Sequence, residues 1–206
     1  MQIKEILNYS PIIAAVKDMK GLTDALDSNV DIIFVLFGDI ISIKEISIKI
    51  KENNKKGILH IDLVEGITNR EVVVKYIKEE TEFEGIISTK SSLLKSAKQY
   101  GFFTIQRFFI FDTISLKNSK SHIVSECDAI EILPGVIPKV IKNISNYTNK
   151  PVVVGGLIDT KEDVILALNA GATNVSTSKK IIWDMWLFIH YFIFNKYMEG
   201  IKWTNM

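Results

Sequence analysis

The stretches Pro151-Val-Val-Val-Gly-Gly-Leu157 and Asn174-Val-Ser-Thr-Ser178 decide the fold, because each is a short apolar run that ends in small residues. Continuous runs of Val and Ile are typical of parallel strands covered on both faces. A helix is predicted after the first stretch, with Thr160 as its N-cap, Asp163 three residues later and Gly171 beyond its end. The two stretches therefore predict consecutive strand–helix units of a parallel sheet.

The same alternation runs through the whole chain. Amphipathic segments with helix start and stop signals separate the apolar runs; one covers 71–77 after a Thr68/Asn69 cap, and another begins at Pro138. The strand candidates are 12–16, 31–37, 57–63, 85–88, 102–107, 128–133, 151–154 and 173–177. Strict alternation of strands and helices predicts a parallel α/β sheet.

Eight strand–helix units favour a closed barrel over an open sheet. We predict a compact TIM-like (β/α)8 barrel with parallel strands, although about 250 residues is the usual size of that fold and this chain has 206. A doubly wound open sheet is the alternative. It is disfavoured because the stretch after the first strand, Val16-Lys-Asp-Met-Lys-Gly21, has no glycine-rich dinucleotide fingerprint.

We predict one domain over residues 1–206, with residues 184–206 as an aromatic-rich C-terminal helix or tail. Its Trp186, Phe188, Tyr191, Phe192 and Phe194 are too many aromatic side chains for one exposed patch. Two hypotheses, which do not exclude each other, follow from this composition. The segment is a last helix that closes the barrel, or it is the interface of a homodimer.

Composition limits the classes of partner. The net charge is +1, so binding to nucleic acid or to an anionic membrane requires a local basic patch. The single Cys127 excludes an internal disulfide, and we expect a buried structural thiol. No signal-peptide pattern opens the chain, and the apolar run 181–194 is shorter than the roughly 20 residues that span a bilayer. We therefore expect a cytoplasmic protein without a membrane anchor.

Polar residues interrupt the apolar runs near the carboxyl ends of the predicted strands, where barrels bind their ligands. They are Lys17, Asp39, His60, Asp62, Glu65, Lys90, Gln106, Arg107, Glu131, Ser176, Thr177 and Ser178. Residues two apart share a face of a strand, so His60 and Asp62 are predicted to line one polar mouth, as are Ser88 and Lys90.

Each of these residues also has an ordinary structural interpretation. A histidine in mid-strand, as His60 is predicted to be, is more often a hydrogen-bonded core residue than a base. Asp62 and Glu131 are flanked by apolar residues and need partners, because burial of an unpaired carboxylate is costly. Lys90 is the natural partner of either carboxylate, in a structural salt bridge. Lys17 and Arg107 are equally compatible with surface positions just past a strand end.

Small residues at two successive strand ends favour a phosphate site. Gly155 and Gly156 on one strand, with Thr177 and Ser178 on the next, can present backbone N–H groups at a helix N-terminus, as well as hydroxyl groups. A cation from Lys17, Lys90 or Arg107 would complete the match to the charge of an anion. These features predict that the chain binds a small phosphorylated molecule.

Several short strings keep a fixed order from about residue 10 to residue 183. They are Pro11-Ile-Ile-Ala-Ala-Val-Lys17, His60-Ile-Asp-Leu63, Gly85-Ile-Ile-Ser-Thr-Lys90, Thr104-Ile-Gln-Arg107, Glu131-Ile-Leu-Pro-Gly-Val-Ile-Pro-Lys139, Val154-Gly-Gly-Leu-Ile158, Ala170-Gly-Ala-Thr173 and Ser176-Thr-Ser178. Together they resemble the glycerol-uptake operon antiterminator family. The Leu-Pro-Gly and Ile-Gln-Arg strings are the most specific, whereas many phosphate-binding barrels share the Gly-Gly-Leu-Ile and Ala-Gly-Ala strings. The segment beyond residue 183 has no counterpart.

The resemblance implies a non-enzymatic bacterial regulator without metal or cofactor. Such a regulator responds to glycerol 3-phosphate and acts on the leader mRNA of glycerol-utilisation genes, allowing transcription past a terminator. Its ligand-binding residues would be Lys17, Asp62, Lys90, Arg107, Glu131, Gly155, Gly156, Thr177 and Ser178. The candidate RNA-binding cations are Lys49, Lys51, Lys55 and Lys56, or Lys179 and Lys180, although such clusters are more often solvated faces.

The alternative function is a TIM-barrel enzyme that acts on a small phosphorylated sugar. In an aldolase-like mechanism Lys90 would form a Schiff base, while Asp62 or Glu131 would transfer protons. The sequence disfavours this mechanism mildly, because no second lysine stands near Lys90 to lower its pKa. A metal-dependent phosphodiesterase would need a carboxylate cluster, for which only Asp62, Glu65 and Glu131 are available.

Overall fold

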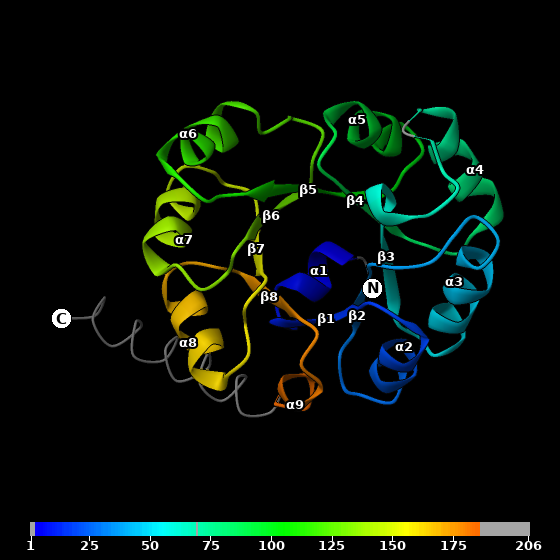
Figure 1. Cartoon of the computed structure of the whole chain (residues 1–206), viewed down its shortest axis with the longest axis horizontal. Coiled ribbons are helices and arrows are strands. Elements are labelled where there is room, and N and C mark those ends of the chain that lie inside the picture. The colour runs from blue at the N-terminus through cyan, green and yellow to red at the C-terminus, as the bar shows by residue number, and fades with distance from the viewer. Residues whose placement is uncertain (1–2, 69, 186–206) are drawn as a thin grey trace.

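The computed structural model describes residues 3–68 and 70–185, and these residues form a closed barrel of eight parallel strands in sequential order (Figure 1). Helices between the strands surround the barrel. The predicted (β/α)8 barrel is confirmed. The open-sheet alternative is wrong, because β1 pairs with β8 and closes the sheet.

The strands are short, as a compact barrel requires. They are β1 Ile12–Val16, β2 Ile32–Val35, β3 Lys56–His60, β4 Gly85–Ser88, β5 Phe103–Phe109, β6 Ala129–Leu133, β7 Val152–Gly155 and β8 Asn174–Thr177. The α-helices are α1 Ile3–Leu7, α2 Met19–Leu26, α3 Ile43–Glu52, α4 Val72–Glu80, α5 Ser91–Gln99, α6 Thr113–Ser121, α7 Pro138–Ser145, α8 Lys161–Asn169 and α9 Lys180–Trp183. A 3-10 turn, η1 Ile61–Leu63, follows β3.

Local signals place most helix boundaries correctly. The Thr160 hydroxyl accepts a hydrogen bond from the Asp163 amide, and the Asp163 carboxylate accepts from the Thr160 amide, so the predicted start of α8 is confirmed. Pro138 occupies the first turn of α7, also as predicted. The start of α4 differs, because Glu71 is its N-cap and Thr68 is not. Asn69, the other predicted cap, lies outside the described residues.

Strand three ends earlier than predicted. The chain leaves the sheet after His60 and turns through η1, so Asp62 does not lie on a strand. In this turn the Asp62 carboxylate accepts hydrogen bonds from Ser88 and Thr89 at the end of β4. On a strand, the same carboxylate would have faced the barrel interior without these partners. Strand five runs further than predicted, because Phe108 and Phe109 continue the pairing with β6.

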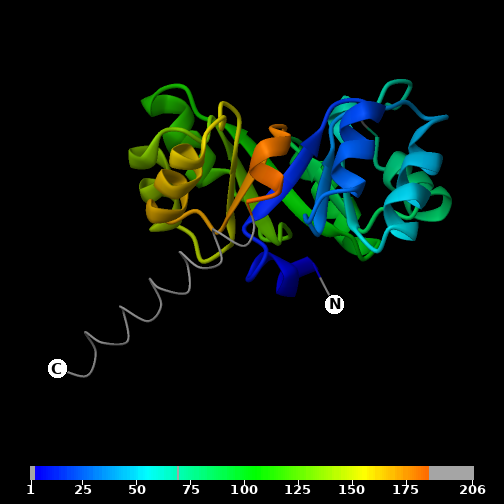
Figure 2. The same cartoon turned by 90° about the horizontal axis from the view of Figure 1, so that it is seen from below.

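The apolar core has two parts. One lies between the strands and the outer helices, and the other fills the barrel interior with residues such as Ile13, Phe34 and Ile105. The short helix α1 packs its buried Ile6 and Leu7 against the interior residues at the N-terminal ends of the strands (Figure 2). This end of the barrel is therefore closed by α1. The predicted closing helix at 184–206 falls almost wholly outside the described residues.

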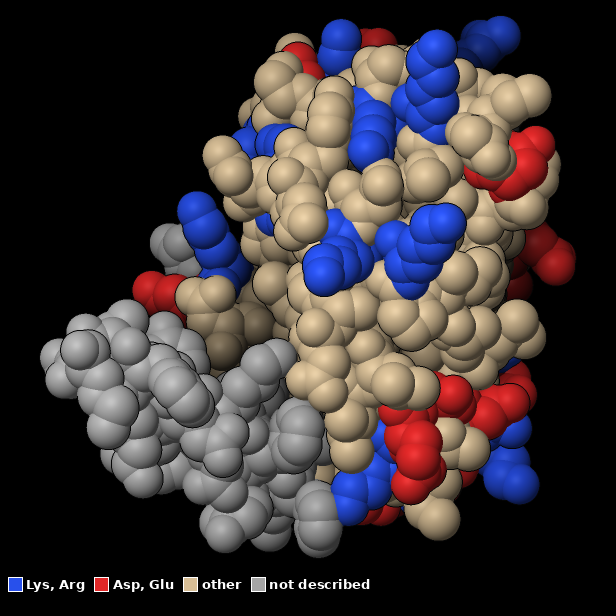
Figure 3. All heavy atoms as spheres, turned by 90° about the vertical axis from the view of Figure 1, so that its left-hand side faces the viewer, with Lys and Arg blue, Asp and Glu red and all other residues tan. Residues whose placement is uncertain are grey.

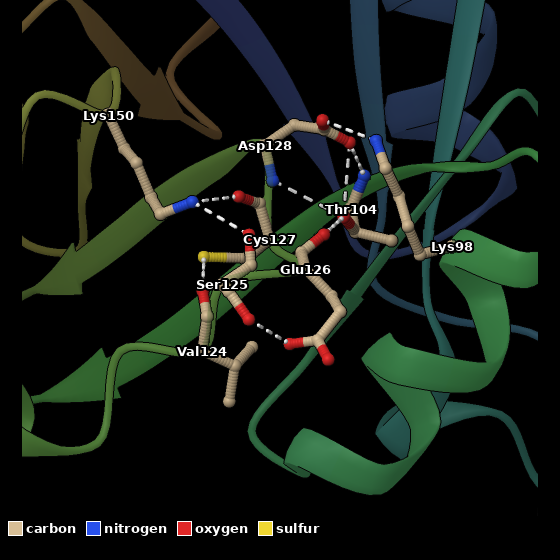
Figure 4. A network of polar contacts seen from close by, with 8 residues as sticks. All are labelled: Lys98, Thr104, Val124, Ser125, Glu126, Cys127, Asp128 and Lys150. Atoms are coloured by element: carbon tan, nitrogen blue, oxygen red, sulfur yellow. Dashed lines mark hydrogen bonds and ion pairs between the residues drawn. The ribbon is translucent and has the colours of Figure 1, made fainter.

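Polar contacts tie β5 to β6 at the same end of the barrel (Figure 4). The Asp128 carboxylate accepts from the Thr104 amide at 3.0 Å, and the Lys150 ammonium donates to the carbonyls of Ser125 and Cys127. Cys127 is buried, as predicted, and burial raises the pKa of its thiol. This network is structural, because it lies opposite the rim where barrels bind ligands.

Across residues 3–68 and 70–185, no helix combines the length and the apolar character needed to cross a membrane.

Candidate ligand-binding site

A cavity of about 330 Å³ opens at the carboxyl ends of β7, β8 and β1. This volume is at the lower end of the range for small-molecule sites. The cavity is lined by Ala15, Lys17, Leu36, Arg107, Glu131, Leu133, Gly156, Leu157, Ile158, Asp159, Ser176, Thr177, Ser178 and Lys179. The closure of the barrel brings the end of β1 next to the end of β8, so residues from both ends of the chain meet there.

The structure gathers most of the predicted site residues around this cavity. They are Lys17, Arg107, Glu131, Gly156, Thr177 and Ser178. Asp62, Lys90 and Gly155 are not in its lining.

A buried ion pair forms the floor of the cavity. The Arg107 Nε donates to the Glu131 carboxylate at 2.7 Å, and the side chains are only 6% and 1% exposed. The Ser176 hydroxyl donates to the other Glu131 oxygen at 2.7 Å. The prediction that Lys90 pairs with Glu131 or Asp62 is wrong. Arg107 lies directly opposite Glu131 in the β5–β6 register and takes that position.

Gly155 makes room for this floor. A Cβ at Gly155 would lie 2.3 Å from the Ser176 hydroxyl and 3.0 Å from a Glu131 oxygen. Any larger residue would therefore break the contact between Ser176 and Glu131. Gly155 thus has a steric role beneath the cavity, and Gly156 is the glycine that reaches its wall.

The loop after β7 has a left-handed backbone at two successive residues. Gly156 has φ +77°, and Leu157 has φ +62° with its side chain 69% exposed. A leucine in this region is uncommon and is seen where the surroundings impose it. The Thr177 hydroxyl donates to the Ile158 carbonyl at 2.8 Å and so fixes the loop on β8.

The groups that remain available to an anion differ in part from those predicted. The hydroxyls of Ser176 and Thr177 already donate within the protein. The start of α8 is closed by its own capping box, so it offers no open helix N-terminus. The amides of Leu157 and Ser178 lie past the last residues of β7 and β8, and they donate to no other described residue.

Lys17 is a cation of the cavity lining that is not engaged in an ion pair with another described residue. Its side chain is exposed, and within the described part of the chain it forms no ion pair. Lys179 also lines the cavity, but it pairs with Asp159 at 3.2 Å. Because the other lining cation, Arg107, is paired with Glu131, an anion entering the cavity would meet Lys17 first.

A second polar cluster lies at the ends of β3 and β4. The Asp62 carboxylate is partly buried, which raises its pKa, but hydrogen bonds from the Thr89 amide and from the hydroxyls of Ser88 and Thr89 outweigh this and lower the pKa overall. Burial, with the nearby charge of Arg107, lowers the pKa of His60 to about 4, so its ring is neutral at pH 7. His60 is a buried core residue, as predicted. Its Nδ1 has no hydrogen-bond partner among the described residues, so the predicted hydrogen bond is not made at this atom.

Several wall residues were not predicted from the sequence. Leu36 follows the period of two from the interior residue Phe34 of its strand, and this signal could have identified it. Ala15, which shares a strand face with Lys17, does line the cavity as that pairing predicts. Leu157, Asp159 and Lys179 come from loops, whose course no periodicity gives. In the described ranges, no three His, Cys, Asp or Glu side chains converge as metal ligands. Asp62, Glu65 and Glu131 therefore do not form the cluster that a metal-dependent phosphodiesterase would need.

The fold and the cavity together define a (β/α)8-barrel protein with a small polar site between its seventh and eighth strands. The family model described as glycerol-3-phosphate responsive antiterminator matches residues 12–183. The uncharacterized protein YgcP of Escherichia coli (strain K12) is 44% identical over 186 residues, which cover 90% of this chain and 97% of YgcP. The chain therefore belongs to the glycerol-3-phosphate responsive antiterminator family, as the resemblance of its motifs implied.

Two solved structures agree with this assignment. The glycerol uptake operon antiterminator regulatory protein from Listeria monocytogenes is 32% identical with a TM-score of 0.80, covering 84% of this chain and 94% of that one. A glycerol uptake operon antiterminator-related protein from Thermotoga maritima is 29% identical with a TM-score of 0.76, covering 86% of this chain and 99% of that one. An aldolase at 14% identity and a TM-score of 0.67 shares the fold alone.

Proposed function

We propose that this chain is a regulator that binds glycerol 3-phosphate in the rim cavity and, in response, binds the leader mRNA of glycerol-utilisation genes. The observation that carries the proposal is the cavity itself, in which the uncommitted Lys17 stands beside free amides of the loops after β7 and β8. The family to which the chain belongs indicates the ligand, glycerol 3-phosphate, and the class of regulator, an antiterminator.

The phosphate would bind at the outer part of the cavity. The Lys17 ammonium and the amides of Leu157 and Ser178 are donors that suit phosphate oxygens, and the Ser178 hydroxyl adds a further donor. Backbone donors on a fixed loop cost little ordering on binding.

The glycerol end would point toward the floor. The Glu131 carboxylate can accept hydrogen bonds from the glycerol hydroxyls, and the terminal guanidinium nitrogens of Arg107 can donate to them. The floor thus distinguishes glycerol 3-phosphate from inorganic phosphate, and the phosphate donors distinguish it from free glycerol.

A chain of hydrogen bonds links the phosphate loop to the neighbouring loops of the rim. The Gly135 amide donates to the Gly156 carbonyl at 3.1 Å, and the Ile110 amide donates to the Leu133 carbonyl at 2.7 Å. A ligand that prefers one arrangement of the β7 loop would therefore shift the population of the loops after β6 and β5. The RNA would bind the arrangement that the ligand favours.

Calorimetric titration with glycerol 3-phosphate tests the ligand. Replacement of Lys17 by Ala should weaken binding by roughly ten-fold or more, because a charge-assisted hydrogen bond is lost. Lys20→Ala is the matched control. Lys20 lies three residues after Lys17 and is not in the cavity lining, so this variant loses the same charge and should bind glycerol 3-phosphate as the wild type does. Equal losses in both variants, or no binding by the wild type, would contradict the proposed site.

Leader-RNA binding with and without glycerol 3-phosphate tests the regulation. The ligand should change the RNA affinity at each of several salt concentrations, and the affinity should fall steeply with salt. An RNA affinity that is the same with and without ligand would rule out control through affinity.

The geometry gives no support to the aldolase-like alternative. Lys90 does not line the cavity, and Asp62 is held by Ser88 and Thr89 rather than aimed at an incoming substrate. Borohydride trapping with several sugar phosphates provides the check. A covalent adduct on Lys90 would revive the enzyme hypothesis.

A further inference from the structure

We propose that the outer face of α6 and α7 is the RNA-binding surface, and that it binds single-stranded RNA. This α6–α7 face is defined by Lys117, Lys120, Lys139, Lys142, Phe111 and Tyr147. The inference rests on the proposed function, because it assumes that the protein binds RNA.

Positive charge predominates on this face, although the Asp112 carboxylate, at the N-cap of α6, lines the same hollow as Phe111 and Lys139. Neither α6 nor α7 contains Asp or Glu, and the described residues give none of its four lysines an ion-pair partner. Figure 3 views the side of the molecule that carries these helices; Lys and Arg side chains spread over its upper and middle parts, while a group of acidic side chains lies in its lower part and others lie at its edges. With a net charge of only +1, such a local concentration is what RNA binding requires.

The lysines that the sequence predicted as candidate RNA-binding cations already form ion pairs or hydrogen bonds within the protein. Lys49 pairs with Glu45, while Lys51 and Lys56 both pair with Glu84. Lys55 donates to two backbone carbonyls. Lys179 and Lys180 pair with Asp159 and Asp24. Each of these contacts would have to be broken, or its carboxylate brought beside a phosphate, for those lysines to bind RNA.

Exposed aromatic rings accompany the lysines. Phe111 is 82% exposed and Tyr147 is 56% exposed, and they lie beside opposite ends of α7. The Lys120 ammonium stands over the Tyr147 ring, 5.0 Å from its centre. Exposed rings interleaved with cations favour single-stranded RNA over a duplex, because unpaired bases stack on aromatic side chains while phosphates meet the lysines.

The face adjoins the ligand cavity. Phe111 lines a small apolar hollow together with Phe109, Leu133 and Gly156. Leu133 and Gly156 also line the cavity proposed for glycerol 3-phosphate. A change in the β7 loop on ligand binding would therefore reach the hollow beside Phe111 directly, and this gives the ligand a short route to the RNA surface.

The test compares two triple variants by fluorescence anisotropy with labelled leader RNA, in saturating glycerol 3-phosphate. K117Q/K139Q/K142Q removes three charges from the face. K44Q/K51Q/K75Q, the matched control, removes three exposed lysines from α3 and α4. Only the first variant should lose affinity, by on the order of ten-fold or more, and its slope of log K against log salt should fall by about 2.

A second variant tests the aromatic part. Phe111→Ala should weaken RNA binding by roughly five-fold or more through lost stacking, whereas Tyr100→Ala at the end of α5 should have no effect. Calorimetric binding of glycerol 3-phosphate and thermal unfolding serve as checks that every variant is folded.

The outcomes separate the two hypotheses. A wild type that binds no leader RNA refutes the proposed function. A wild type that binds RNA, with both triple variants weakened equally or not at all, leaves that function standing and refutes the α6–α7 face. If Phe111→Ala changes the sedimentation mass but not the RNA affinity, the face is a protein interface, and the inference is likewise overturned.

Discussion

Single residues of the floor determine what the cavity can hold. Glu131 is buried with Arg107 on one carboxylate oxygen and Ser176 on the other, and Gly155 leaves the space for this contact. Burying two charges is costly, so a pair of this kind is a weak source of net stability. In the proposed function, this buried pair would instead present fixed polar groups to the ligand.

The first prediction concerns the loss of one partner. Arg107→Met should lower the free energy of unfolding by about 3–5 kcal/mol, because Glu131 is left buried without a counter-charge. The double variant Arg107→Met/Glu131→Leu should recover much of that loss. Urea denaturation measures both values. A single variant that loses less than about 1 kcal/mol would show that water or another cation reaches Glu131.

The second prediction concerns pH. The pKa of His60 is lowered to about 4 by burial and by Arg107, while Asp62 opposes this shift. In the unfolded chain the ring binds a proton below about pH 6.5, whereas the folded chain keeps it neutral until about pH 4. Stability should therefore fall by about 3 kcal/mol as the pH drops from 6.5 to 4, and remain constant above that range with respect to this group.

Urea denaturation at several pH values measures this fall. His60→Gln should flatten it, whereas His122→Gln, at an exposed position, should keep the wild-type profile. The pKa of the Asp62 carboxyl is also lowered, so part of the loss below pH 4 will remain in both variants. If the profile of His60→Gln matches that of the wild type, the buried neutral ring is not the cause.

At the scale of helices and strands, contacts within one helix could be predicted from the sequence, whereas contacts between residues far apart in the sequence could not. The capping box of Thr160 and Asp163 and the first-turn Pro138 act within one helix, so the sequence was sufficient to find them. The pairing of Arg107 with Glu131 depends on the register of β5 against β6, which no local pattern specifies. The sequence therefore predicted Glu131 and Arg107 as site residues but assigned Glu131 the wrong partner.

The role of α1 was also invisible in the sequence. Five residues are too few for a clear amphipathic pattern. Ile6 and Leu7 are buried because they pack against the interior residues at the end of the barrel, a contact that no local pattern specifies. The Asn174 amide donates to the carbonyls of Leu7 and Ser10, which anchors the segment to β8. The helix is thus part of the core, although it precedes the first strand.

The third prediction tests this closure. Leu7→Ala should lower the free energy of unfolding by about 2–5 kcal/mol, since a side chain that is 3% exposed leaves a cavity. Leu166→Ala is the control, because that leucine is 54% exposed on α8 and its loss should change stability by less than about 0.5 kcal/mol. Binding of glycerol 3-phosphate should be unchanged in both folded variants. Similar stability losses for the two leucines would mean that α1 does not close the barrel.

At the scale of the whole molecule, closure of the barrel creates the site. Lys17 and Ser178 lie at opposite ends of the sequence, and only the pairing of β1 with β8 brings them to one cavity. The prediction of a closed barrel was therefore enough to expect a cavity at the ends of the seventh and eighth strands, and the structure has one there. The prediction could not show that the hydroxyls of Ser176 and Thr177 are already used, because those bonds depend on loop positions.

A crystal structure of the protein with glycerol 3-phosphate, grown well above its dissociation constant, tests the central claim most directly. The account predicts phosphate oxygens within hydrogen-bond distance of the Leu157 and Ser178 amides and of Lys17, with the glycerol hydroxyls toward Glu131. Clear density for the ligand at any other place, or an empty cavity in a crystal whose protein binds the ligand in solution, would contradict it.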